Sequence, residues 1–371
     1  MSEKNTRIRR PNITKGIVNS TNEWDSLEEV IVGRGVPSEL PAIEFTFKLF
    51  FHDNIYNTTF GDGTNGYITR RHIDEHNEDV ENFAALLQSH NIIVKRPKLP
   101  ERIYKIKTQH WESVVHPALN VRDQTMIVDD TIIETPPSCR WRYFENDYMK
   151  HLFLDYFKQG AKWIQAPKPL MLDESFDLDY VEKMSHARQH YEALKKQSYM
   201  ACGHEIMFDA ANCMRLDEHI LVNVSNKNQE LGAKWLQDVL PNKKILTAPL
   251  ADSHIDSSIL FLRPGVAIVA KPQVKDKLPA FFDDWDLIYI PMRNRSDEDY
   301  TKQGIKLASP QIELNILSIN PNTILCHPEY RDLLHSALSK YKIDVIPSQI
   351  RHCEIFSGAH HCITLDIRRK A

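Results

Sequence analysis

Five short segments of this 371-residue chain have the pattern of β-strands that stop at a proline. Proline has no backbone N–H to donate to a sheet ladder, so each proline is a natural strand end. The five segments are 91–97, 161–167, 243–249, 286–291 and 342–347. A stretch with apolar residues three and four positions apart precedes each one, which predicts helices over 74–90, 145–160, 229–240, 275–285 and 329–341. Pro279 interrupts the fourth helix and weakens its pattern.

Apolar strand pairs lie between these units. They are predicted over 126–133, over 259–270 with a turn at Pro264-Gly265, and over 314–326 with a turn at Asn320-Pro321-Asn322. A strand pair, a helix and one further strand cannot bury their apolar face alone. Five such units therefore predict a closed ring in which each neighbour completes the next. The alternative is a generic α/β protein in which prolines happen to end strands.

Composition excludes several classes of function. The formal net charge is −4, from 46 basic and 50 acidic residues, and gives no reason to expect nucleic acid or an anionic membrane as a partner. No run approaches the roughly 18 apolar residues of a membrane span. Residues 1–17 are expected to form a loose basic arm without a secretory signal, before a single domain over 18–371. Six dispersed cysteines predict reduced thiols and a cytoplasmic location.

Four short polar clusters interrupt the apolar strands. They occupy 120–123, 207–212, 252–256 and 361–362, each at the same end of a strand pair. In a ring of units these clusters would point into one central channel. Polar groups that converge from several strand ends are a common way to build a site.

The residue types in these clusters predict one chemistry. Cys362, on a small Ser-Gly-Ala turn at the start of an apolar run, is a candidate nucleophile. His254 can exchange a proton near neutral pH, and Asp209 can orient a histidine. Asp123 and Asp256 remain as anions that suit a planar cation, because carboxylate–guanidinium pairing is strong and selective. The pattern predicts attack by Cys362 on a guanidinium carbon.

Each residue also has a structural explanation. Cys362 could be a buried, inert thiol, His254 a satisfied strand-end histidine, and Asp209 a helix cap. Asp123 and Asp256 could be turn residues. A zinc site is a further alternative, although its spacing fits no standard finger. It would draw on His352, Cys353, His360, His361 and Cys362.

Several long motifs, in order from about residue 18, resemble the glycine amidinotransferase family, which transfers an amidino group from arginine to an amine. They are 20–25, 27–33, Arg122-Asp123, 132–134, 140–145, 160–163, 166–169, 208–211, 254–256 and His361-Cys362 with Thr364, Asp366 and Arg368-Arg369. The resemblance covers nearly the whole chain and continues into its last residues.

The resemblance implies a fold and a reaction. The fold is a five-fold pseudosymmetric α/β propeller (pentein) of ββαβ modules around a central channel, in agreement with the internal period. The reaction is a ping-pong transfer in which Cys362 is the nucleophile, His254 the general acid/base and Asp209 its partner. Asp123 and Asp256 would hold the guanidinium of L-arginine, and ornithine would leave. No metal and no organic cofactor are implied.

The chain departs from the family pattern at several positions. Ser357-Gly358-Ala359 replaces three glycines, and Asn212 replaces an acid. Val274 stands where the family carries the arginine that binds the donor carboxylate, so either Lys271 or another cation takes that role or the donor is held differently. Ser309 is what remains of a double serine.

Ser253 is small where glycine-using members carry methionine. The change predicts an amine acceptor larger than glycine. The sequence most resembles the secondary-metabolism branch of this family, which implies a role in the synthesis of guanidine-containing natural products of the saxitoxin type.

Two other functions fit the same residues. A guanidine hydrolase of the same fold, such as an arginine deiminase, would let water attack the covalent intermediate. A catalytically silent protein would bind an arginine-like ligand or a partner without reaction.

The segment 54–71, rich in Asn, Thr and Gly, is the expected lid over the channel. The oligomeric state is left open, with a homodimer as one option.

Overall fold

The computed structural model describes residues 16–37, 46, 68–101, 103, 105–115, 118–180, 202–251, 254–291 and 312–371. In this part of the chain, five three-stranded sheets repeat one topology. The first two strands of each sheet are antiparallel, and the third is parallel to the second. A helical connection leads from the second strand to the third, because parallel neighbours need a crossover. The internal period predicted from the sequence is therefore confirmed.

Module one combines the last strand of the chain with the first, and module two follows it in sequence. Module one consists of β17 (Thr364–Lys370), β1 (Ser26–Val32), α3 (Arg70–Ser89) and β2 (Ile93–Lys95). Module two consists of β5 (Thr125–Val128), β6 (Thr131–Glu134), α4 (Lys150–Lys158) and β7 (Lys162–Gln165). A short hairpin of β3 (Lys105–Lys107) and β4 (Glu112–Val114) lies between them in sequence.

The other three modules follow without interruption of the pattern. Module three is β8 (Cys213–Leu216), β9 (His219–Asn223), α7 (Lys227–Val239) and β10 (Lys244–Ala248). Module four is β11 (Ile259–Arg263), β12 (Val266–Val269) and β13 (Asp286–Tyr289). Module five is β14 (Leu317–Asn320), β15 (Thr323–Cys326), α9 (Arg331–Leu338) and β16 (Asp344–Pro347).

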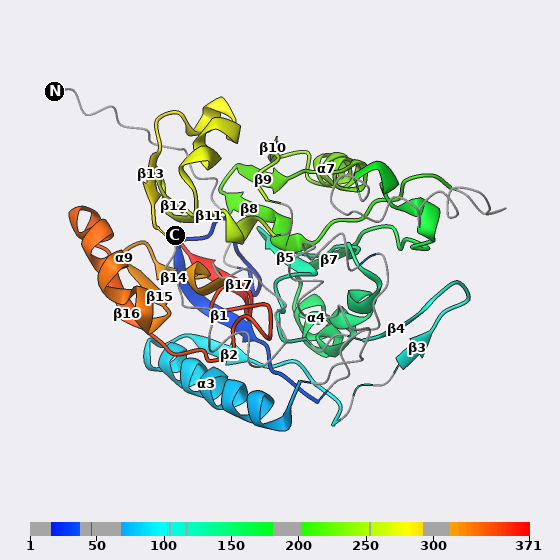
Figure 1. The fold of residues 1–371 in the computed structure, drawn as a ribbon, viewed down its shortest axis with the longest axis horizontal. Helices are drawn as coiled ribbons and strands as arrows, with labels where there is room; N and C mark the ends of the chain where they lie inside the picture. The colour runs from blue at the N-terminus through cyan, green and yellow to red at the C-terminus, as the bar shows by residue number, and fades with distance from the viewer. Residues whose placement is uncertain are drawn as a thin grey trace.

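Shared apolar clusters join neighbouring modules into a ring. One cluster joins β1 and β17 to β5, β6 and α4, and a second joins β5 and β6 to β8, β9 and α7. A third runs from β8–β10 through β11 and β12 to β15 and α9, and a fourth returns from β14 and β15 to β1 and α3. In Figure 1 the first strands β17, β5, β8, β11 and β14 surround the middle, and the third strands lie farther out.

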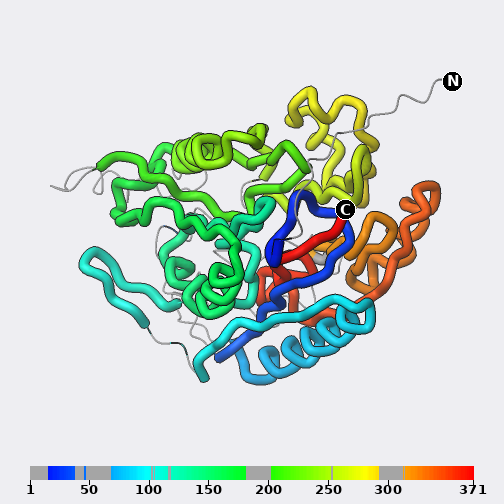
Figure 2. The backbone as a smooth tube through the Cα atoms, turned by 180° about the vertical axis from the view of Figure 1, so that it is seen from behind, coloured from blue at the N-terminus to red at the C-terminus, as the bar shows by residue number. Residues whose placement is uncertain are grey.

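The two ends of the chain close this ring. β17, the last strand, pairs antiparallel with β1, the first, from Ser26↔Lys370 to Val32↔Thr364. Figure 2 shows the blue and red segments side by side at the centre of the molecule. The first module therefore forms only when residues more than 300 positions apart meet.

The strand ends follow the prolines, with two local differences from the predicted elements. β2, β7, β10 and β13 end one or two residues before a proline, and β16 ends on Pro347. The predicted helix over 275–285 is wrong, since Pro279 divides the region into 3-10 helices Pro272–Lys277 and Ala280–Phe282. The predicted strand pair over 314–326 begins later, because a 3-10 helix at Ile312–Leu314 precedes β14.

Other predicted features fall partly outside the described residues. Of the expected lid over 54–71, residues 54–67 are not described, and Arg70 and Arg71 begin α3 behind the capping hydroxyl of Thr69. Of the expected arm, residues 1–15 are not described. None of the described helices has the length and hydropathy needed to cross a bilayer.

Candidate active site

The ends of the five modules meet around one buried constellation. Each module contributes a polar residue two to five positions before its first strand, where the chain enters the middle of the ring. These residues are Asp123 before β5, Asp209 before β8, His254 and Asp256 before β11, Asn315 before β14, and Cys362 before β17. Four of the five segments that lead into these strands are the polar clusters predicted from the sequence. The fifth, at Asn315, was not predicted.

Cys362 lies in the turn that leads into β17 and is 1% exposed. Its thiol donates to Asp256 Oδ2 at 3.2 Å. Its backbone N–H donates to Asn315 Oδ1 at 2.8 Å, and Asn315 Nδ2 donates to the same Asp256 oxygen at 2.7 Å. Asn315 therefore fixes the position of the sulfur relative to the carboxylate. Burial, then the charges of Asp256 and Asp123, raise the pKa of the Cys362 thiol well above its usual range.

The turn before Cys362 requires a glycine at one position. A Cβ on Gly358 would lie 2.1 Å from Asn120 Oδ1 and 3.0 Å from the Cβ of Cys362. Asn120 itself donates to the carbonyls of Phe356 and Ser357 at 3.1 and 3.2 Å, so it cannot move away without loss of both bonds. Ser357 adopts a φ of 55° in the left-handed region that glycine favours. The close approach at Gly358 explains why this member of the Ser-Gly-Ala turn has no side chain.

Asp256 is the hub of the site. Its Oδ2 accepts from Cys362, Asn315 and, at 2.9 Å, from Nδ1 of His361. Burial alone would raise the pKa of this carboxyl, but the hydrogen bond and charge of His361, with smaller effects of His254 and Cys362, lower it to about 2. Asp256 is therefore a stable anion beside the thiol.

His254 and Asp209 form a second pair. His254 Nε2 lies 2.9 Å from Asp209 Oδ2, and His254 Nδ1 lies 3.6 Å from Asp123 Oδ2. Burial lowers the pKa of His254, but the carboxylates of Asp123 and Asp209 more than offset this and raise it overall. Asp209 precedes a 3-10 helix without capping it through its side chain. Its other oxygen accepts from Gln124 Nε2 at 2.9 Å and from the Ser138 N–H at 2.8 Å.

One carboxylate oxygen of Asp123 accepts a hydrogen bond, and the other has no partner among the described residues. Its Oδ2 accepts from Arg142 Nη1 at 2.5 Å, and Arg142 makes two further bonds to Glu145. Its Oδ1 is buried and meets no hydrogen-bond partner among the described residues. Burial raises the pKa of Asp123 despite the charge of Arg142. An unpaired buried carboxylate oxygen is costly, so it marks a place for a donor from outside.

A buried ionic cluster supports the turn that carries Cys362. Arg122 Nε donates to the carbonyls of His361 and Thr364 at 3.0 and 2.9 Å, on both sides of the cysteine. Its other nitrogens pair with Asp366 at 2.6 Å and Glu23 at 3.3 Å. The motifs that contain these residues contributed to the resemblance, but no feature of the sequence indicated that they meet.

The remaining predicted residues are placed as follows. Ser253 and Ser309 lie outside the described residues. Val274 is 5% exposed and packs in the apolar cluster of modules three to five, so no cation stands at this position. Lys271 is exposed.

The residues of the alternative zinc site have separate partners. His360 lies 2.9 Å from the Ser348 carbonyl, Cys353 donates to the Ile350 carbonyl, and His352 contacts Glu75 at 2.7 Å. Within the described ranges no group of three or more such side chains is placed to hold a metal ion.

Known proteins resemble this chain over nearly its full length. The inosamine-phosphate amidinotransferase 1 of Streptomyces griseus is 32% identical over 370 residues, 96% of this chain and 98% of the relative. The mitochondrial glycine amidinotransferase of Xenopus laevis is 30% identical over 356 residues, 95% of this chain and 82% of the relative. No protein-family model matches the chain.

A solved structure has the same fold. It is that of SxtG, an amidinotransferase from Microseira wollei in the saxitoxin biosynthetic pathway. It superposes with a TM-score of 0.77 at 28% identity and covers 96% of this chain and 98% of its own.

Proposed function

Because the chain belongs to the amidinotransferase family, we propose that it moves the amidino group of L-arginine to an amine through a covalent intermediate on Cys362. Ornithine is the product of the first half-reaction. The observation that carries this proposal is the hydrogen bond from the Cys362 thiol to Asp256, in one buried site with the His254–Asp209 pair and the open oxygen of Asp123.

The guanidinium of arginine fits between Asp123 and Asp256. Asp123 Oδ1 offers an unoccupied acceptor among the described residues, and Asp256 is an anion beside the sulfur. Carboxylates outnumber cations here, since Arg142 balances only part of the charge of Asp123, Asp209, Asp256 and Glu145. A planar cation that donates to both carboxylates would be held with its central carbon near Sγ.

The bound cation also activates the thiol. In the free site, burial and two carboxylates hold the proton on Cys362. A guanidinium between these carboxylates offsets their charge, which favours the thiolate. The protein therefore keeps its nucleophile protonated until the donor arrives.

His254 carries the proton in both half-reactions. Sγ bonds to the guanidino carbon, the bond from that carbon to the ornithine nitrogen breaks, and the proton lost by the thiol ends on the leaving nitrogen through His254. In the second half-reaction an amine attacks the amidino carbon, His254 takes its proton, and the carbon–sulfur bond breaks to return the thiol. The raised pKa of His254 favours the imidazolium that the first step needs as an acid.

The acceptor is proposed to be an amine larger than glycine, in the synthesis of a guanidine-containing natural product. The small Ser253 beside His254 supports this, as does similarity to enzymes named for inosamine phosphate and for the saxitoxin pathway. The relative named for glycine shows that the acceptor varies within the family. We also propose a cytoplasmic location, since the six cysteines are thiols and not disulfides.

Intact-protein mass spectrometry after incubation with arginine and no acceptor tests the proposal. We expect a mass gain of one amidino group that maps to the peptide of Cys362, with free ornithine. Cys362→Ser should show neither, and Cys353→Ser, a matched change at a buried thiol with a separate partner, should keep both. Citrulline in place of the adduct would make the protein a hydrolase. No adduct and no product would make it a silent binding protein.

A further inference from the structure

Arg142 connects Asp123 to a second buried carboxylate, that of Glu145. Arg142 ends the 3-10 helix Arg140–Arg142 and is 2% exposed, and Glu145 begins the next 3-10 helix and is 1% exposed. Nε and Nη2 of Arg142 donate to the two oxygens of Glu145 at 2.7 and 3.1 Å, and Nη1 donates to Asp123 Oδ2 at 2.5 Å. All three guanidinium nitrogens are therefore used, yet the proposed transfer assigns neither Arg142 nor Glu145 a role.

Glu145 is itself fixed relative to Asp123. The neighbouring Asn146 accepts from Thr125 Oγ1 at 2.9 Å and donates to the carbonyl of Gln124 at 2.9 Å. These two partners directly follow Asp123 in the chain. Two parallel bonds between a guanidinium and a carboxylate also set the plane of the guanidinium. The third nitrogen of Arg142 is therefore aimed at Asp123 by a frame that includes Asp123 itself.

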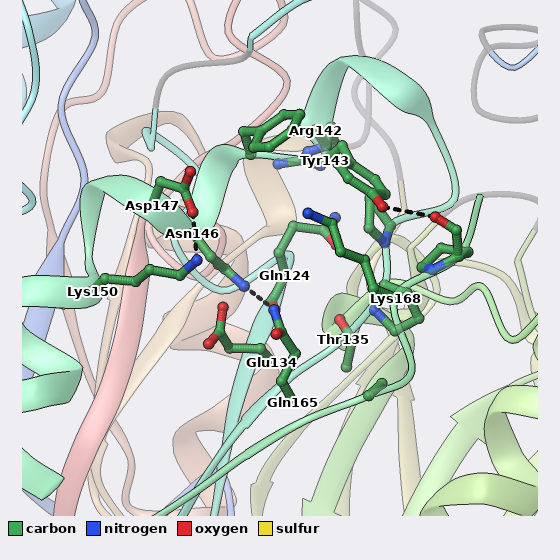
Figure 3. Close-up of a pocket in the computed structure, with 15 residues that line it drawn as sticks. Gln124, Glu134, Thr135, Arg142, Tyr143, Asn146, Asp147, Lys150, Gln165 and Lys168 are labelled. Carbon is green, nitrogen blue, oxygen red and sulfur yellow. Dashed lines mark hydrogen bonds and ion pairs between the residues drawn. The ribbon is translucent and has the colours of Figure 1, made fainter. Parts of the chain in front are cut away.

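Packing alone does not hold Arg142 in this position. Its side chain lines a cavity of about 100 Å³ in module two, together with Gln124 and Tyr143 (Figure 3). A side chain beside a void has no neighbouring atoms on that side to confine it. The two bonds to Glu145 are therefore the contacts that direct the guanidinium toward Asp123.

The consequence appears at the two oxygens of Asp123. Oδ2 accepts from Arg142, whereas Oδ1 is buried and has no partner in the described part of the chain. Asp256 is divided in the same way, because its Oδ2 accepts three hydrogen bonds and its Oδ1 accepts none from the residues that the structure describes. Each carboxylate thus has one oxygen held by the protein and one left for a ligand.

We propose that Arg142, held by Glu145, is a positioning residue that orients Asp123 so that Oδ1 receives the guanidinium of the donor. The inference rests on the proposed function, in which Asp123 binds L-arginine. Because Oδ2 is bonded to Arg142, the carboxylate cannot rotate to satisfy Oδ1 elsewhere without loss of that bond. A lysine could not take over this role, since an ammonium has no planar fork with which to contact both carboxylates in fixed directions.

Charge gives a second way to observe the same contact. Burial raises the pKa of Asp123, Arg142 lowers it, and Glu145 raises it. Removal of the charge of Glu145 should therefore keep Asp123 ionised to a lower pH. The charged and titratable groups that act on Asp123 and Arg142 are Glu145 in module two, Asp209 before β8, His254 and Asp256 before β11, and Cys362 before β17.

Isothermal titration calorimetry with L-arginine tests the proposal in a Cys362→Ser background, where binding is measured without reaction. Arg142→Lys keeps the charge without the fork and should weaken the Kd by about 10–150-fold, the usual effect of a lost hydrogen bond to a charged group. Arg140→Lys is the matched control. It makes the same change at a buried arginine that bonds to the Met171 carbonyl and Asp173, and it should leave the Kd unchanged.

Glu145→Gln keeps the shape of the side chain and removes its charge. Arginine binding in this variant should persist to a lower pH than in the background, an effect that a purely structural role of Glu145 would not produce. A Kd in Arg142→Lys equal to that of the background, or an unmoved pH dependence in Glu145→Gln, would overturn the proposal. Either folded variant is sufficient for this. Absence of arginine binding in the Cys362→Ser background itself would instead refute the proposed donor.

Discussion

Asp256→Asn should make the thiol of the free enzyme more reactive and the enzyme less active. Asp256 Oδ2 lies 3.2 Å from Cys362 Sγ and is a stable anion, so it opposes the thiolate as long as no donor is bound. Asparagine keeps the shape of the side chain and can still accept from His361 and Asn315, but it removes the charge. The variant therefore separates the two roles of this residue, which are to restrain the thiol and to bind the guanidinium.

The distance gives the size of the effect. Two unit charges 3.2 Å apart interact by about 5 kcal/mol at an effective dielectric constant of about 20. If His361 and Arg122 offset half of this, about 2.5 kcal/mol remains, and the thiolate population at a given pH rises by about 70-fold. A less basic thiolate is also less nucleophilic, by about 7-fold for this change. Alkylation of Cys362 should therefore become about tenfold faster in the variant.

The assay is the rate of iodoacetamide labelling at neutral pH without arginine, resolved by peptide mass spectrometry. The exposed Cys202 in the same sample is the internal standard and should react at one rate in both proteins. Ornithine release from arginine should fall by about 10–150-fold in the same variant, since a hydrogen bond to a charged group is lost. Labelling of Cys362 that is unchanged or slower would refute the idea that Asp256 restrains the thiol. A variant with undiminished ornithine release would refute its role in binding the donor.

Three further perturbations test other parts of the site. Asp209→Asn removes a charge that raises the pKa of His254, so His254 loses its proton at a lower pH in this variant. The alkaline limb of the pH–rate profile for ornithine release should therefore move to lower pH. An alkaline limb at the same pH as in wild type would contradict the pairing of Asp209 with His254. Gly358→Ala places a Cβ against Asn120 and should lower the free energy of unfolding by about 1–3 kcal/mol, measured by urea denaturation against wild type. Val274→Arg should lower the free energy of unfolding by about 3 kcal/mol or more, because it buries a charge in an apolar cluster. It should not restore binding of the donor carboxylate. An unchanged Tm together with a lower KM for arginine would contradict this expectation.

Local signals in the sequence were enough to predict most of the module. The ends of the third strands depend on a proline, and the turn at Gly265, with its φ of 79°, depends on a glycine. Each of these constraints acts on the backbone of one or two residues, so it can be recognised from the sequence. In the failed helix over 275–285, Pro279 outweighed the apolar period. The period also predicted four of the five segments that lead into a first strand. These segments contain Cys362, His254, Asp209, Asp123 and Asp256.

The sequence by itself thus determined the repeated unit and the residue types at its polar ends, because both are properties of short segments. Only the tertiary structure decided which units meet. The pairing of β1 with β17, the contact of Asn315 with Cys362 and the bond of Arg142 to Asp123 join distant or differently placed parts of the chain. Hydrogen bonds of this kind leave no local pattern, since each partner alone resembles an ordinary polar residue. Burial at the centre of a closed ring is what brings them together, and it is also what leaves Asp123 Oδ1 without a partner among the described residues.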